Sequence, residues 1–86
     1  MDLGVRDVPS RLAGLLLQLA ETEGMVTRKG RKIANRYTHD QLAAMISARR
    51  VAVTRALSAL RKVGAVEVRG GQIFIKNTKL LERTAA

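Results

Sequence analysis

The fold is decided by one stretch, residues 37–66, whose sequence is YTHDQLAAMISARRVAVTRALSALRKVGAV. It predicts two helices joined by a tight turn. Thr38 is expected to cap the first helix with its hydroxyl, while Gln41 reaches back to the main chain in a capping box. Ser47 and Ala48 follow at the place of a turn of about three to four residues. The apolar face of this first helix consists of Leu42, Ala43 and Ile46.

The second helix, about residues 50–63, is predicted to have one apolar face and one basic face. At about 100° per residue, the buried stripe consists of Val53, Ala56, Leu57 and Leu60. The outer side carries Val51, Thr54, Arg55, Ser58, Arg61 and Lys62, with Arg50 at its shoulder. From Arg49 to Lys62 there are five basic residues and no acidic one. Such a helix, set against a shorter one, is what reading bases in the major groove of DNA requires. The alternative is a merely solvated outer face, but solvated faces usually mix both signs of charge.

Composition bounds the class of protein. Eighty-six residues predict one small domain, and only Tyr37 and Phe74 are aromatic, so the core must be aliphatic. The net charge of +9 predicts an acidic partner, either nucleic acid or an anionic membrane surface. The absence of cysteine excludes a disulfide framework, a thiolate nucleophile and a zinc knuckle. No apolar run approaches the roughly 18 residues of a membrane span, and the N-terminus lacks a secretory signal pattern. We therefore expect a soluble, cytoplasmic chain.

Upstream of the decisive stretch, a helix and a hairpin are predicted. Asp7 is placed to cap a helix that runs to about Glu21 and is ended by Gly24. Two short strands then follow, at 25–28 and 33–37, joined by residues 29–32. The segment 28–36 holds five basic residues, which either touch phosphates or form a solvated turn; these alternatives stay open.

Downstream, the alternating segments 66–69 and 72–76 flank Gly70-Gly71, which can supply the positive φ angles of a two-residue turn. A hairpin directly after a recognition helix is a wing, and its Arg69 is expected to contact the phosphate backbone. Asn77 or Thr78 then caps a short last helix. The predicted fold is α+β, mainly α: a winged helix-turn-helix over residues 7–86, with residues 1–6 as a tail or a severed interdomain hinge.

These elements resemble the C-terminal DNA-binding domain of Crp/Fnr-type transcription regulators. The resemblance lies in their order, in Asp7-Val8, in the RYTHDQLAAMI segment at 36–46 and above all in the R-x-x-V-T-R-x-L run at 50–57. It covers about Asp7 to the end of the chain. No single element would be specific alone. The R-x-x-V-T-R-x-L run, at its distance behind the helix cap of Thr38 and Gln41, is fairly specific for the family.

The resemblance implies a set of DNA contacts. Two arginines would use forked donors on guanine O6 and N7, and the implied base-reading set is Arg50, Val51, Thr54 and Arg55. The implied phosphate-contact set is Val8, Thr38, His39, Arg49, Ser58, Lys62 and Arg69. Asp7-Val8 would form the hinge to an effector-sensing domain, and the first hairpin, about residues 25–33, would offer a surface to RNA polymerase. Neither a cofactor nor a metal is expected in this chain.

Three positions depart from the usual family pattern. Many members have a Ser that caps the recognition helix and a Glu one residue after the first arginine, where this chain has Arg49 and Val51. Val51 offers apolar contact to a thymine methyl instead of an acceptor for cytosine. The helix is thus more similar to the nitrogen-control branch of the family than to the cyclic-AMP branch. We expect a half-site that keeps the guanine of cyclic-AMP-type sites but has a T·A pair where those sites have G·C. The usual turn glycine is Ser47, which is expected to fit with a negative φ.

The chain lacks the sensor and dimer helix of the family, which suggests an excised domain or a shortened form. It is expected to be monomeric and to bind a half-site weakly, whereas the intact regulator would place two copies of it on a pseudo-palindrome.

Other functions stand as alternatives. One is a stand-alone winged-helix repressor, and another is a winged helix used as a protein- or RNA-interaction module, although such modules usually lack base-reading side chains. Membrane binding would need an exposed apolar face that the core here requires. An enzyme fits least, since His39 and Asp40 are adjacent on a helix and do not face each other.

Overall fold

The computed structural model describes residues 7–86; the tail or hinge expected at residues 1–6 lies outside the described residues. Its elements follow the predicted order of helix, hairpin, helix, turn, helix, hairpin and short helix. They are α1 (Val8–Glu23), β1 (Gly24–Thr27), β2 (Gly30–Ile33), α2 (His39–Met45), α3 (Arg50–Lys62), β3 (Val66–Arg69), β4 (Gln72–Ile75) and α4 (Thr78–Ala85). The fold is an α+β winged helix-turn-helix, as the sequence predicts.

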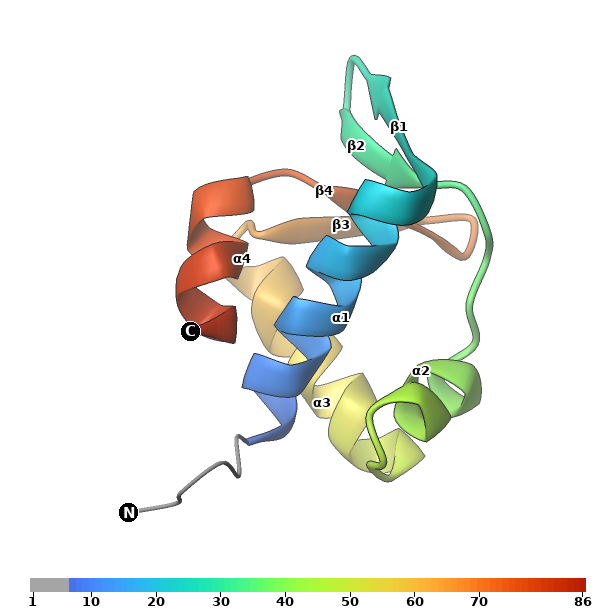
Figure 1. Cartoon of the computed structure of the whole chain (residues 1–86), viewed down its shortest axis with the longest axis vertical. Coiled ribbons are helices and arrows are strands. Elements are labelled where there is room, and N and C mark those ends of the chain that lie inside the picture. The colour runs from blue at the N-terminus through green and yellow to red at the C-terminus, as the bar shows by residue number, and fades with distance from the viewer. Residues whose placement is uncertain (1–6) are drawn as a thin grey trace.

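The two hairpins form one sheet, which the sequence pattern does not predict. The strand order is β1-β2-β4-β3, and every neighbouring pair is antiparallel. The hairpins are joined through β2 and β4, where Arg31 lies opposite Ile75 and Lys32 opposite Phe74. In Figure 1 the first hairpin rises above the end of α1, whereas the wing hairpin runs sideways behind α1 and above α3, so the two hairpins extend in different directions.

The first hairpin is shorter than predicted, and the predicted position of its second strand is wrong. That strand spans Gly30–Ile33, not 33–37, and the turn is Arg28-Lys29. The Thr27 hydroxyl holds this turn, since it donates to the Gly30 carbonyl at 2.6 Å and accepts from the Lys29 amide at 3.1 Å. Pairing with β4 then sets the register. The segment 34–38 is consequently a connection to α2, not a strand.

The helix pair begins as predicted. The Thr38 hydroxyl accepts from the Gln41 amide at 3.0 Å, and the Gln41 side-chain oxygen accepts from the Thr38 amide at 2.8 Å, which completes the capping box. Helix α1 ends at Glu23, two residues later than expected, and Gly24 follows as its cap. The predicted apolar stripe of α3 is buried: Val53, Ala56, Leu57 and Leu60.

The turn between α2 and α3 corrects one expectation. Ser47 has a φ of +54°, in the left-handed region, where a negative value was expected. The reason is the way α2 ends: the Ala48 amide donates to the Ala43 carbonyl at 2.9 Å and the Ser47 amide to the Ala44 carbonyl at 3.4 Å. This is a Schellman motif, which requires a left-handed residue at the position of Ser47. Ser47 therefore bears the steric cost that the usual glycine avoids.

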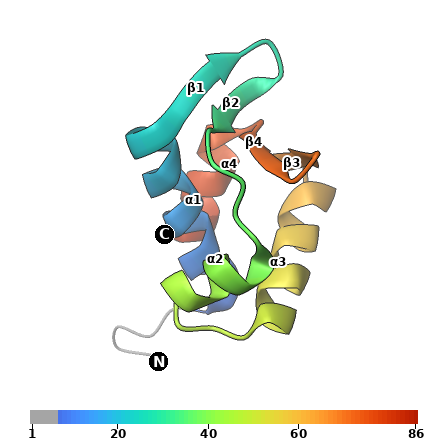
Figure 2. The same cartoon turned by 90° about the vertical axis from the view of Figure 1, so that its right-hand side faces the viewer.

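The core is aliphatic, as predicted, and α1 runs through its centre (Figures 1 and 2). Helix α1 packs against α3 on one side and α4 on the other, with β2 over its C-terminal end. The largest fully buried side chains are Leu12, Leu16, Ile33, Leu42, Val53 and Leu81. Among residues 7–86, none of the helices combines the length and the apolar character needed to cross a membrane.

Candidate nucleic-acid interface

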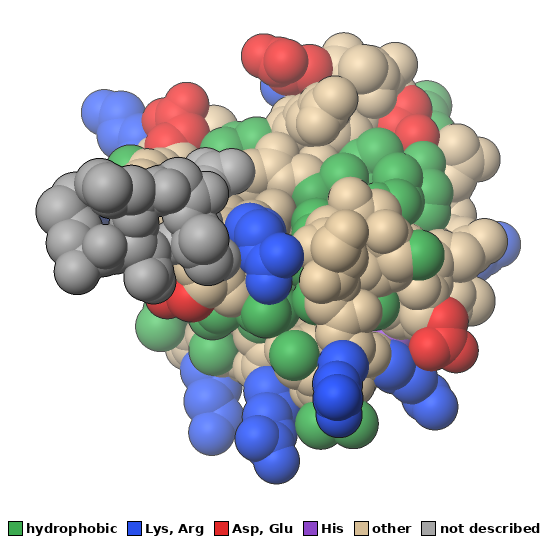
Figure 3. Space-filling view, turned by 60° about the horizontal axis from the view of Figure 1, so that its bottom comes forward, with side chains coloured by type: hydrophobic (Ala, Val, Ile, Leu, Met, Phe, Trp, Pro, Cys, Tyr) green, Lys and Arg blue, Asp and Glu red, His purple; other side chains and the backbone are tan. Residues whose placement is uncertain are grey.

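The predicted base-reading residues lie together on the outer face of α3. Because the opposite stripe of this helix is buried, all of them are exposed to solvent. They line one shallow hollow of about 270 Å³, formed by Arg50, Val51, Thr54 and Arg55. Seen toward the end of the molecule that carries α2 and the start of α3, Lys and Arg side chains gather along the lower edge of the surface (Figure 3). This exposed, basic helix face is suited to the major groove of DNA.

A hydrogen bond links the two helices at this face. His39 Nδ1 and Thr54 Oγ1 lie 2.7 Å apart, so the first turn of α2 contacts the middle of α3. If the Thr54 hydroxyl donates, the ring proton of neutral His39 sits on Nε2, which can then donate to an anion. The structure thus brings together one predicted phosphate contact and one predicted base reader, a pairing that the sequence did not indicate.

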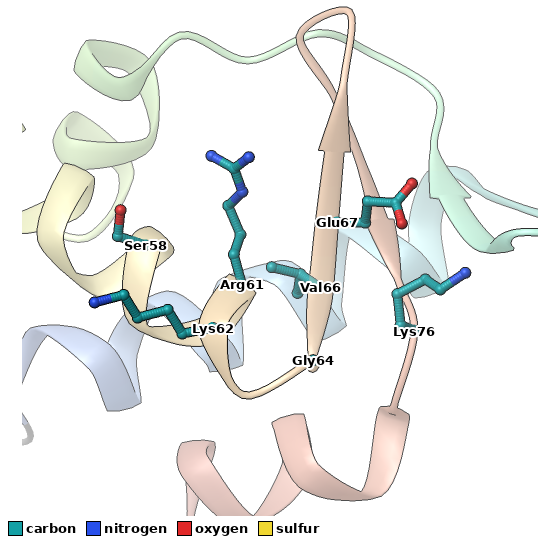
Figure 4. A pocket seen from close by; sticks show the side chains of 7 residues that line it. All are labelled: Ser58, Arg61, Lys62, Gly64, Val66, Glu67 and Lys76. Carbon is teal, nitrogen blue, oxygen red and sulfur yellow. The ribbon is translucent and has the colours of Figure 1, made fainter.

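The C-terminal half of α3 borders a second, larger hollow. It has a volume of about 510 Å³ and is lined by Ser58, Arg61, Lys62, Gly64, Val66, Glu67 and Lys76. Figure 4 shows the side chains of Ser58, Arg61 and Lys62 projecting from α3 on one side and those of Glu67 and Lys76 from the wing hairpin on the other. Ser58 and Lys62 belong to the predicted phosphate-contact set. Arg61 does not, although its helical angle already placed it on the basic side.

The wing has the predicted turn, but its Arg69 is paired with a carboxylate. Gly70 and Gly71 have φ angles of +56° and +79°, as a two-residue hairpin turn with positive φ requires. Arg69 forms an ion pair through its Nε with the Glu67 carboxylate, and this is the one ion pair recorded among residues 7–86. The charge of the predicted wing contact is therefore compensated locally.

Arg36 lies outside the wing hairpin but contacts its turn, and the sequence does not predict this contact. Its Nε donates to the Gly70 carbonyl at 2.9 Å, although 34 positions separate the two residues. Nearby, the Gln72 side-chain amide donates to the Ala34 carbonyl at 3.2 Å. Arg36 lies in an irregular segment without periodicity, so only its positive charge signalled a role.

The remaining predicted contacts lie at helix starts. Arg49 precedes α3, is exposed and makes no capping hydrogen bond with its side chain, as expected. The Thr38 hydroxyl is already an acceptor in the capping box. Val8 begins α1 and is half-buried against the core, so only its main chain could meet a phosphate.

Behind the interface, Glu23 anchors the segment that leads to α2. The Tyr37 hydroxyl donates to this carboxylate at 2.5 Å, and the Asn35 amide donates to it at 2.8 Å. The hydrogen bond from Tyr37, together with those from Asn35, lowers the pKa of Glu23 against the opposing effect of burial. The same bond raises the pKa of Tyr37. Within the described part of the chain, no three His, Asp or Glu side chains gather as a metal site would need.

The chain matches the model of the Crp-like helix-turn-helix domain over residues 10–84. It is 31% identical over 84 residues to a CRP-like cAMP-activated global transcriptional regulator of Mycobacterium tuberculosis. The aligned region covers 98% of this chain and 38% of the relative. Among solved structures, the CO-dependent transcription factor CooA of Carboxydothermus hydrogenoformans is 26% identical with a TM-score of 0.85, covering 93% of this chain and 37% of CooA.

A CRP/FNR-family transcriptional regulator of Thermus thermophilus is 27% identical, with a TM-score of 0.82, over 93% of this chain and 41% of that protein. The chain thus spans 38% of the length of the curated relatives that it matches.

Proposed function

The chain belongs to the family of Crp-like helix-turn-helix domains, and we propose that it reads the sequence of double-stranded DNA as the DNA-binding domain of a transcription regulator. One observation carries this proposal: Arg50, Val51, Thr54 and Arg55 form a single exposed hollow on a helix that has no acidic residue. Helix α3 lies in the major groove with this hollow on the base edges, and the wing lies on the sugar–phosphate backbone.

The base-reading step follows from the donors and methyl groups in the hollow. Arg50 and Arg55 carry forked guanidinium donors that fit O6 and N7 of guanine. Val51 has no polar atom and contacts a thymine methyl group, so the preferred half-site keeps a guanine and has a T·A pair. Thr54 keeps its hydrogen bond to His39 and contributes its own methyl group.

Contacts with phosphates set the register and most of the affinity. Arg49 and Lys62 supply charge at the two ends of α3, and Ser58 adds a hydroxyl between them. His39 donates from Nε2, and Thr38 and the main chain of Val8 approach phosphates at helix starts. Each contact with a phosphate releases counterions, so binding weakens as salt rises.

A longer, dimeric regulator is part of the proposal, since the matched relatives are longer than this chain. Two copies would bind half-sites one helical turn apart on a pseudo-palindrome. The 86-residue chain alone would bind a half-site weakly as a monomer. Contact with RNA polymerase and a cytoplasmic location belong to the intact regulator in this proposal.

Selection from a random duplex library tests the function, with the 86-residue chain and a tethered dimer in parallel. We expect a half-site with a fixed guanine and a T·A pair, repeated with dyad symmetry for the dimer. Recovery of no motif, together with affinity that collapses in salt, would contradict base reading. A module for protein or RNA interaction would then fit better, and competition with RNA of the same length would separate those two.

A further inference from the structure

We propose that Arg36, which lies outside the wing hairpin, supplies the main phosphate contact of the wing. The inference rests on the proposed DNA binding and adds a residue that the predicted contact set lacks. It assigns Arg36 the role that the sequence suggested for Arg69.

The Arg36 side chain lies against the wing turn. Its Nε donates to the Gly70 carbonyl at 2.9 Å, and its Cδ would lie 3.5 Å from a Cβ placed on Gly71. The side chain therefore lies along the wing turn. A guanidinium has five N–H donors; the one on Nε is used, and no partner is recorded for the Nη atoms among residues 7–86. These atoms remain available to a phosphate.

The charges of the wing hairpin favour Arg36 over Arg69. The carboxylate of Glu67 is ion-paired with Arg69, so these two side chains together add no net charge to the hairpin. The remaining tip residues are Gly70 and Gly71, which carry none. A phosphate at the wing tip would thus meet the guanidinium of Arg36, which no carboxylate among residues 7–86 pairs with.

Arg36 is held in place in the protein without DNA. Both its neighbours are anchored, because Asn35 and Tyr37 donate hydrogen bonds to Glu23. The Gln72 side chain ties the wing to the same segment at Ala34. A side chain ordered on folding loses little further entropy on binding, which favours affinity.

Arg36 also lies close to two other predicted phosphate contacts. Arg36 shares a hollow of about 280 Å³ with Thr38 and His39, both predicted to contact phosphates, and with Gly71 of the wing turn. One phosphate seated over this hollow could therefore touch the wing tip and the start of α2 together. Because α2 and the wing are separate elements, Arg36 would couple their positions on the duplex.

Salt-dependent titration of a half-site duplex tests the assignment. For Arg36→Ala we expect weaker binding to every sequence and a salt slope smaller by about 0.9, the value of one contact with a duplex phosphate. Its affinity deficit should then shrink by about 3- to 4-fold between roughly 50 and 200 mM salt. Arg36→Lys keeps the charge and should recover the slope. Arg83→Ala, which removes a guanidinium from α4 on the opposite side of the molecule from the wing turn, is the matched control (Figure 1).

Two outcomes would overturn the inference: a slope for Arg36→Ala equal to that of the parent chain, or a larger slope reduction for Arg69→Ala than for Arg36→Ala. An affinity loss without a slope change would mean that Arg36 only shapes the wing. The same titrations with a scrambled half-site report the proposed function separately. If the parent chain discriminates between the two duplexes while Arg36→Ala keeps its slope, only the assignment of Arg36 fails.

Discussion

Replacing Val51 by glutamate should change which base pair the domain prefers while leaving the fold at least as stable. The Val51 side chain is 60% exposed, so its replacement removes little buried apolar surface. Helix α3 has no acidic residue in its first turn, and a carboxylate there gains roughly 0.3–1 kcal/mol from the helix dipole. A glutamate four residues before Arg55 also forms a helical ion pair worth about 0.2–0.5 kcal/mol. The free energy of unfolding should therefore rise by roughly 0.5–1.5 kcal/mol.

The same substitution should change the base preference and weaken DNA binding. The carboxylate accepts a hydrogen bond from the N4 amino group of cytosine, whereas Val51 offers only a methyl contact to thymine. A good base contact discriminates by about 1–3 kcal/mol, which corresponds to roughly 5- to 150-fold in relative affinity. The preferred pair should shift from T·A toward C·G by that factor. Overall affinity should fall on every sequence, because the new negative charge repels the phosphates.

Competition binding measures both effects, with duplexes that differ only at the contacted pair. Val51→Gln is the matched control, since it keeps the shape of glutamate without its charge, and urea unfolding of each variant reports the stability. A Val51→Glu chain that is folded, binds DNA and still selects the same motif as the parent would refute the placement of this residue on the bases.

Three further perturbations test other parts of the structure. Arg55→Ala should lower discrimination at one base pair by roughly 1–3 kcal/mol, measured by competition; equal losses on all sequences would remove its base-reading role. Ser47→Gly should raise the free energy of unfolding, measured in urea, by about 0.5–1 kcal/mol, because the relief of left-handed backbone strain exceeds the entropy that glycine adds to the unfolded chain. Ser58→Gly, within α3, is the control and should lower the free energy of unfolding. A lower free energy of unfolding in both variants would contradict the turn geometry. Tyr37→Phe should weaken the pH dependence of stability. The pKa of Glu23 is lowered in the folded chain, so its contribution is present above about pH 4.3 and is lost as the pH falls further; identical acid unfolding of parent and variant would exclude this link.

The helix pair and the wing turn are predictable because their signals are local. The capping box at Thr38, the buried stripe of α3 and the two-glycine turn of the wing are local features, specified by residues within a few positions of one another. Their spacing therefore predicts the elements, their order and the face of α3 that is left exposed to solvent. The same spacing placed Arg50 and Arg55 on that face.

The errors have a common origin in contacts between distant segments. The sequence pattern misplaces the second strand of the first hairpin because the position of this strand depends on pairing with β4, more than 40 positions away. The left-handed φ of Ser47 follows from the way α2 closes against the turn, not from the preference of serine.

By itself, then, the sequence determined the winged helix-turn-helix, its aliphatic core and the basic outer face of α3, because periodicity and caps act within one element. The tertiary structure decided how charges and donors are shared between elements. It paired Arg69 with Glu67, joined His39 to Thr54 across 15 positions and brought Arg36 to the wing turn across 34. Such partners depend on where separate segments lie in space, and no spacing along the chain contains that information.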